Sequence, residues 1–170
     1  QSALLPPQDV IDKVLDNYFV LNKPRDIVSG DFYWIANAHD KVYVCVADCT
    51  GHGVPGAFMS MLGMALLNEA VNIDGIAEPG KILDYLRMQI IRTLHQTEET
   101  SIVKDGMDIA LFSIDFKEMK MEYAGAHNSL YLVRENELVE FQPDKMPISI
   151  YYNMHDFKTN IVNLEKGDLI

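Results

Sequence analysis

After Lys41, apolar and β-branched residues fill positions 42–47, a pattern typical of a buried β-strand. This predicted strand ends on the carboxylate Asp48, and four glycines follow within the next fifteen residues. Pro55 then favours the start of a helix, because its missing N–H is not needed in a first helical turn. From Phe58 onward apolar residues recur at helical spacing and predict a helix to about Val71. The pattern therefore predicts a strand, a carboxylate at its end, a glycine loop and a helix.

The rest of the chain divides into a helical and an extended half. Apolar residues at a spacing of three or four predict a second helix over 79–93, which we expect to pack antiparallel to the first on one sheet face. After a polar loop at 96–106 the pattern changes to a period of two, which predicts strands. The other predicted elements are a short helix over 8–15 and strands over 18–21, 107–116, 121–124, 130–133, 138–141 and 157–164.

Two carboxylates are predicted to meet at one edge of the sheet. A turn at 37–40 joins the strand that follows Asp31 to the strand that ends at Asp48. Antiparallel pairing brings the start of the first strand beside the end of the second. Carboxylates pressed together raise each other's pKa, so a bound cation explains the pair economically. Oxygen ligands without a His or Cys cluster favour Mg²⁺ or Mn²⁺. The alternative is that Asp and Gly serve only turn and capping chemistry here.

Composition narrows the class of protein. The 170 residues are 48% hydrophobic and 23% charged, as expected for one globular domain with its own core. A net charge of −11 argues against binding to nucleic acid or to anionic membranes, since phosphate contact needs clustered cations. Cys45 and Cys49 are too far apart along one strand to form a disulfide. Unpaired thiols without a secretory segment indicate a cytoplasmic protein.

Three further side chains are candidates for a role at this site. We expect His52, in the glycine loop, to shape that loop rather than to act as a general acid. We expect His127 to have a structural role and to link a strand end to its neighbour. Arg25 has the fork of donors that suits a substrate phosphate. An exposed ion pair between Arg25 and Asp26 is the equal alternative.

Four motifs carry a resemblance to a known family. They are Ser-Gly-Asp-Phe-Tyr at 29–33, Asp-Cys-Thr-Gly-His-Gly-Val at 48–54, Tyr-Ala-Gly-Ala-His-Asn at 123–128 and Met-Pro-Ile at 146–148. In content, order and spacing the chain resembles the SpoIIE/RsbU-type bacterial branch of the PPM (2C-type) metal-dependent protein phosphatases. The resemblance runs over nearly the whole chain. It implies an α+β fold, an α-β-β-α sandwich with two sheets face to face and a helix pair outside each.

The resemblance also implies an activity and its ligands. The family hydrolyses phosphoserine or phosphothreonine on a partner protein with a water that bridges two Mn²⁺ or Mg²⁺ ions. Carried over by position, Asp31 and Asp48 are metal ligands and catalytic residues, with Asp48 bridging both ions. The main-chain carbonyl of Cys49 is a further ligand.

The chain departs from the family pattern at its C-terminus. The family has one or two more ligand aspartates on strands that would follow Ile170, so we expect residues 1–170 to be a single phosphatase domain truncated there. Asp108 and Asp168 do not match those positions. Residues 1–7 resemble the end of a linker helix that joins an upstream sensor domain, and the parent protein could attach to a membrane through such a sensor.

The resemblance suggests partners as well. The implied substrate is a phosphorylated regulator of the anti-sigma-factor antagonist type, and a homodimer is a family-level expectation. The alternative function is a catalytically silent domain that binds and regulates partners, because the second metal site is incomplete in this chain.

Overall fold

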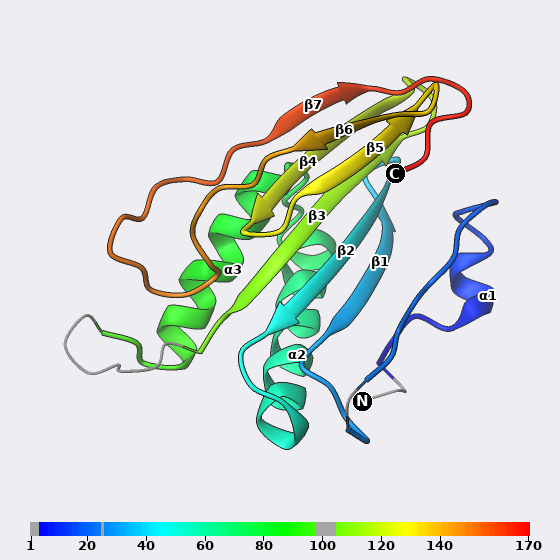
Figure 1. The fold of residues 1–170 in the computed structure, drawn as a ribbon. Coiled ribbons are helices and arrows are strands. Elements are labelled where there is room, and N and C mark those ends of the chain that lie inside the picture. Colours follow the sequence, from blue (N-terminus) through cyan, green and yellow to red (C-terminus); the bar gives the residue numbers. More distant parts are fainter. Residues whose placement is uncertain (1–3, 25, 98–104) are drawn as a thin grey trace.

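A five-stranded antiparallel sheet forms the centre of the molecule (Figure 1). The structure is a computed structural model, and it describes residues 4–24, 26–97 and 105–170. The strand order in this sheet is β1-β2-β3-β4-β7, and β5 and β6 form a second sheet. The strands are β1 (Phe32–Ala38), β2 (Lys41–Cys49), β3 (Met107–Asp115), β4 (Lys120–Ala126), β5 (Leu130–Arg134), β6 (Glu137–Phe141) and β7 (Asn160–Asn163).

Helices cover one face of the five-stranded sheet (Figure 1). They are α2 (Gly53–Asn68), its π-helical continuation η1 (Glu69–Ile73) and α3 (Pro79–Thr93). The main core lies between these helices and alternate residues of β1–β4. A second, smaller core lies on the other face, where β5 packs on β3, β4 and β7. This mixed α/β architecture with an antiparallel sheet confirms the predicted fold class. The described residues supply three of the four layers of the expected sandwich.

The predicted hairpin is confirmed in its register. Phe32 lies opposite Ala47, and the pairing runs to Ala38 opposite Lys41. Only His39 and Asp40 form the turn, with φ angles of 53° and 58°. Two consecutive positive φ values are typical of the tight turns whose twist matches that of paired strands.

Two sequence-based expectations about elements are wrong. Residues 18–21 were expected to form a strand, but they are not paired with any described strand. Phe19 and Leu21 are 83% and 74% exposed there, so no sheet face buries the apolar residues that suggested a strand. The short helix α1 also ends early, at Gln8–Ile11.

The helix after the glycine loop is apolar enough to cross a membrane by length and composition, over Gly53–Ile73. Here 56% of that stretch is buried inside the molecule. Met64, Leu67 and Ala70 belong to the main core. The apolar composition therefore reflects packing on the sheet.

Candidate metal centre

Three aspartates occupy one end of the five-stranded sheet. Asp31 directly precedes β1, whose first residue lies opposite Ala47. Asp48, the next residue of β2, lies opposite Asp108 of β3. Ala47 and Cys49 on either side of Asp48 are buried under the helices. Successive side chains of a strand point to opposite faces, so Asp48 and Asp108 both belong to the face away from the helices.

Asp48 is electrostatically strained. Partial burial raises the pKa of its carboxyl, and the charge of Asp31, a hydrogen bond with the Asp31 carboxyl and the charge of Asp108 raise it further. The predicted meeting of Asp31 and Asp48 is thus confirmed. A nearby cation would favour the ionised form of both groups and remove this strain.

The glycine loop brings the main chain close to this carboxylate pair. A methyl group at Gly30 would lie 2.9 Å from the Cys49 carbonyl oxygen and 2.8 Å from the Gly51 carbonyl oxygen. Gly56 of α2 packs on Gly51 in the same way, with 2.5 Å between that added methyl and the carbonyl oxygen. Glycine is required here because two main-chain segments approach without room for a side chain. The carbonyl oxygens of the loop are therefore gathered next to Asp31.

The side chain of Cys49 takes no part in this arrangement. It lies in the main core, and burial, with the charges of Asp48 and Asp31, raises the pKa of its thiol to about 12. A thiol that stays protonated is a poor metal ligand and nucleophile. Cys45 is buried and unpaired as well. If Cys49 binds metal, its main-chain carbonyl is the available ligand, and that role stays a prediction.

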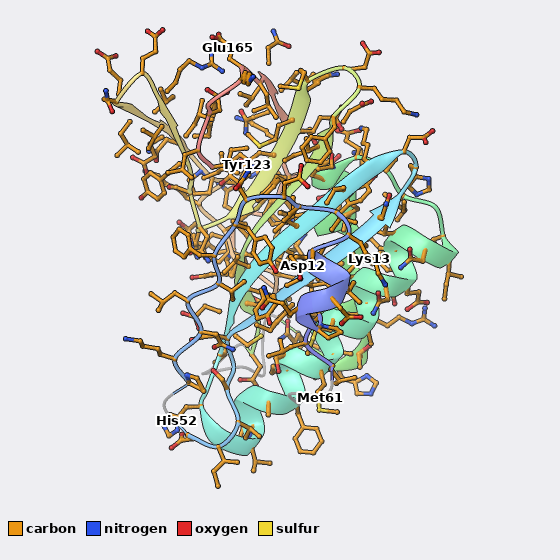
Figure 2. The ribbon with its side chains drawn as sticks, turned by 90° about the vertical axis from the view of Figure 1, so that its right-hand side faces the viewer. Asp12, Lys13, His52, Met61, Tyr123 and Glu165 are labelled. Carbon is orange, nitrogen blue, oxygen red and sulfur yellow. The ribbon has the colours of Figure 1, made fainter. Side chains whose placement is uncertain are left out.

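His52 lies within the glycine loop. The His52 Nδ1 atom lies 3.4 Å from Asp26 Oδ2, which ties the glycine loop to the segment before β1. Figure 2 shows His52 beside the start of α2, and its side chain is exposed to solvent. This contact agrees with the expected loop-shaping role. Arg25, the candidate for phosphate binding, lies outside the described residues.

The structure confirms that His127 links the end of β4 to the neighbouring strand β3, and it adds the partner Asp108, which sequence reasoning missed. The His127 Nδ1 atom lies 2.9 Å from Asp108 Oδ1. His127 is the centre of a three-residue γ-turn, with a φ of 58° and a bond from the Asn128 N–H to the Ala126 carbonyl oxygen at 2.7 Å. A γ-turn of positive φ is rare and strained, by about 1–3 kcal/mol for a residue other than glycine. The alternation of β3 could have marked Asp108 as facing this side, whereas the turn leaves no mark in the sequence.

The donor set fits a hard divalent cation. Asp48 and Asp108 line a cavity of about 330 Å³ together with Cys49, Thr50 and Gly51. All the side-chain donors at the aspartate row are carboxylate oxygens, which Mg²⁺ and Mn²⁺ prefer. Among the described residues, no three His, Cys, Asp or Glu side chains converge on one point as a complete metal cluster. The carboxylates of Asp31 and Asp48 therefore suit part of a site for such a cation, and their role as ligands stays a prediction.

Comparison with known proteins gives a family. Residues 38–170 match the family model of stage II sporulation protein E (SpoIIE). The whole chain is similar to the phosphoserine phosphatase RsbU of Bacillus subtilis (strain 168), with 26% identity over 176 residues. The chain spans 48% of the length of RsbU.

Solved structures agree with the fold. The PP2C domain of SiaA from Pseudomonas aeruginosa is 31% identical, with a TM-score of 0.84 over 98% of this chain and 64% of that one. A crystal structure of RsbX in complex with magnesium is 18% identical, with a TM-score of 0.62 over 87% of this chain and 67% of that one. The SiaA domain thus shares sequence as well as fold, whereas RsbX shows the fold alone.

Proposed function

The chain belongs to the SpoIIE family, and from this premise we propose that it is the catalytic part of a metal-dependent protein serine/threonine phosphatase. The observation that carries the proposal is the Asp31–Asp48 pair. Its carboxyls share a hydrogen bond, and the pKa of Asp48 is raised by burial and by the neighbouring charge. The repulsion between the two carboxyl groups lowers the stability of the fold, and a bound cation would remove this repulsion.

The proposed roles divide among four residues. Asp31 and Asp48 would hold the Mn²⁺ or Mg²⁺ ions that the resemblance implies, and the Cys49 carbonyl would be a further ligand. Such ions, when bound, supply a hydroxide near neutral pH and neutralise the phosphoryl oxygens. The glycine loop keeps side chains away from this place, so a phosphorylated segment has room to approach. Arg25 would bind the substrate phosphate.

Further proposals concern the whole protein. We propose that aspartates on later strands complete the metal centre, as the resemblance implies. RsbU is named a phosphoserine phosphatase, so we propose a phosphorylated regulatory protein of the anti-sigma-factor antagonist type as the substrate. Cytoplasmic localisation, an upstream sensor domain and a homodimer belong to the same proposal.

A second function is favoured by one observation. The described residues hold no complete cluster of metal-ligating side chains. A catalytically silent domain that binds and regulates partners through the same surface would not need a complete metal site.

Hydrolysis of a generic phosphate ester by the full-length protein tests the two functions. We expect hydrolysis to depend on Mn²⁺ and to be abolished by Asp48→Asn. The matched control is Asp40→Asn, because Asp40 is an exposed aspartate in the β1–β2 turn, where it pairs with Lys117. We expect this control to retain activity. Absence of hydrolysis at every metal concentration would instead support the binding domain.

A further inference from the structure

The row of polar groups at the metal end of the sheet continues beyond the predicted ligands. From β1 to β4 it contains Asp31, Asp48, Asp108 and His127, in the order in which the strands lie side by side. His127 follows β4 directly and forms a bridge to Ile109, the neighbour of Asp108 in β3. The imidazole contacts Asp108, which lines a cavity together with Asp48.

Several contacts hold this imidazole in place. The main-chain N–H of His127 donates to the main-chain carbonyl oxygen of Asp144 at 3.0 Å. The main-chain N–H of Asp144 donates to the Gly125 carbonyl oxygen at 2.9 Å. The ring meets the Tyr151 ring edge to face, with 6.4 Å between the centroids. Strained backbone persists only where the surroundings fix it, and such positions cluster at functional sites.

The hydrogen-bond chemistry leaves one ring nitrogen of His127 available. An ionised carboxylate can only accept, so the Nδ1 atom facing Asp108 carries a proton and donates it. The remaining nitrogen is Nε2, and the imidazolium form carries an N–H there as well. The His127 side chain is 36% exposed and that of Asp108 is 41% exposed, so the pair is open to a ligand.

We propose that Asp108 and His127 form a substrate-positioning pair, in which Asp108 fixes the imidazole and Nε2–H donates to an oxygen of the phosphorylated substrate. The inference rests on the proposed function and adds a binding residue to it. His127 is the residue that touches substrate, and Asp108 acts through it. A purely structural His127 would gain nothing from the left-handed backbone, which glycine adopts freely.

A glycine at position 127 separates a structural role of His127 from a substrate-binding role. His127→Gly relieves the backbone and removes the imidazole. We expect an unchanged or higher midpoint of thermal unfolding for this variant. We also expect a roughly tenfold rise in the Kd for inorganic phosphate and in the KM for a phosphoseryl peptide, as for the loss of one hydrogen bond to a charged group. His127→Asn, which tolerates positive φ and keeps a donor, should restore part of the affinity.

Calorimetric titration of the Mn²⁺-loaded full-length protein with inorganic phosphate measures the affinity. The matched control is His155→Asn, since His155 is another partly exposed histidine beside a carboxylate, with its Nε2 atom 3.1 Å from Asp144 Oδ1. Its phosphate affinity should equal that of the wild type. Loss of stability in His127→Gly together with unchanged Kd and KM would overturn the inference and leave the phosphatase proposal intact.

The nitrogen resonances of His127 distinguish the remaining outcomes. If the wild type binds phosphate but hydrolyses nothing, the proposed function fails. In that case a phosphate-dependent shift at Nε2 supports the inference, and an unchanged resonance overturns it. A wild type that binds no phosphate overturns the inference, and the hydrolysis assay alone then decides the proposed function.

Discussion

Asp48 is the residue at which the fold and the proposed chemistry oppose each other. Burial, the Asp31 charge, the hydrogen bond with Asp31 and the Asp108 charge all raise the pKa of its carboxyl. A carboxyl with a raised folded-state pKa binds more protons when folded than when unfolded, so stability falls as the pH rises through that pKa. At neutral pH the ionised Asp48 carboxylate, which is the form that binds a metal ion, therefore lowers the stability of the metal-free protein.

Asp48→Asn should consequently stabilise the metal-free protein. We expect its midpoint of thermal unfolding at pH 7 to rise by about 2 °C, since removing one partly exposed like-charge contact contributes less than about 1 kcal/mol. Addition of Mg²⁺ or Mn²⁺ should raise the midpoint of the wild type and leave the variant unchanged, because only the state that binds metal is stabilised. Thermal unfolding with and without metal measures both effects.

The comparison for this prediction is Asp40→Asn, which removes an equal charge at an exposed turn. It should keep the response to metal. A destabilised Asp48→Asn protein that still responds to Mn²⁺ would contradict the assignment of Asp48 as a ligand.

At the residue scale the sequence predicts half of this site. Asp31 and Asp48 were predictable because a short turn fixes the register of one hairpin, and the pairing of the carboxylates follows from it. The contact between Asp108 and His127 depends on β3–β4 pairing and on a positive φ at a histidine. No local pattern encodes that conformation, so the sequence suggested only a structural histidine.

The β1–β2 hairpin and the end of α2 form a unit at the scale of elements. Trp34 Nε1 donates to Asn68 Oδ1 at 3.1 Å, and His39 Nε2 lies 3.1 Å from the Val71 carbonyl oxygen. The Tyr43 hydroxyl donates to the Ala77 carbonyl oxygen at 2.9 Å. A π-helical turn leaves carbonyl groups out of the regular α-helical ladder, and such turns need outside partners. Of these three contacts, the one from His39 reaches a carbonyl group of η1, at Val71, and the other two hold the residues on either side of it.

Tyr43→Phe tests how much this unit contributes. Tyr43 is fully buried, so the variant leaves the Ala77 carbonyl without its partner inside the protein. We expect a loss of about 1–2 kcal/mol in the free energy of unfolding, measured in urea with an unchanged slope. Tyr131→Phe is the matched control, because the Tyr131 side chain is exposed and its contact with Glu140 is 3.4 Å long. Equal losses in the two variants would contradict the argument.

The same unit marks the limit of element prediction. The helix over Pro79–Thr93 and the period-two strands were predicted within a few residues, because one face of each is buried. The π-helical register after Asn68 was not predicted, since its partners come from the hairpin in space and not from neighbouring residues. The expected strand over 18–21 failed for the opposite reason, as its apolar residues have no paired strand beside them.

At the scale of the molecule, Arg134 joins the second sheet to the C-terminal residues. It donates to Asp168 at 2.8 Å and 2.7 Å, to Glu165 at 2.7 Å and to the Asn163 carbonyl oxygen at 2.9 Å. Leu169 pairs with Val133 in an antiparallel bridge. In Figure 2, Glu165 lies at the end of the molecule opposite His52. The contacts of Arg134 are therefore separate from the candidate metal centre.

The contribution of the Arg134–Asp168 pair to stability should depend on pH in a defined interval. The hydrogen bond from Arg134 lowers the pKa of Asp168 from 3.8 to about 2. A lowered pKa means that the unfolded state binds more protons, so the stabilisation is complete above pH 3.8 and is lost as the pH falls through about 2. Asp168→Asn should lower the midpoint of thermal unfolding at pH 6, and the difference from the wild type should shrink steadily below pH 4. Asp156→Asn removes an exposed partner of Lys81 instead and should have little effect at either pH. If the Asp168→Asn difference stays constant down to the lowest pH at which the protein folds, Arg134 closes the molecule through Glu165 and the main chain rather than through this carboxylate.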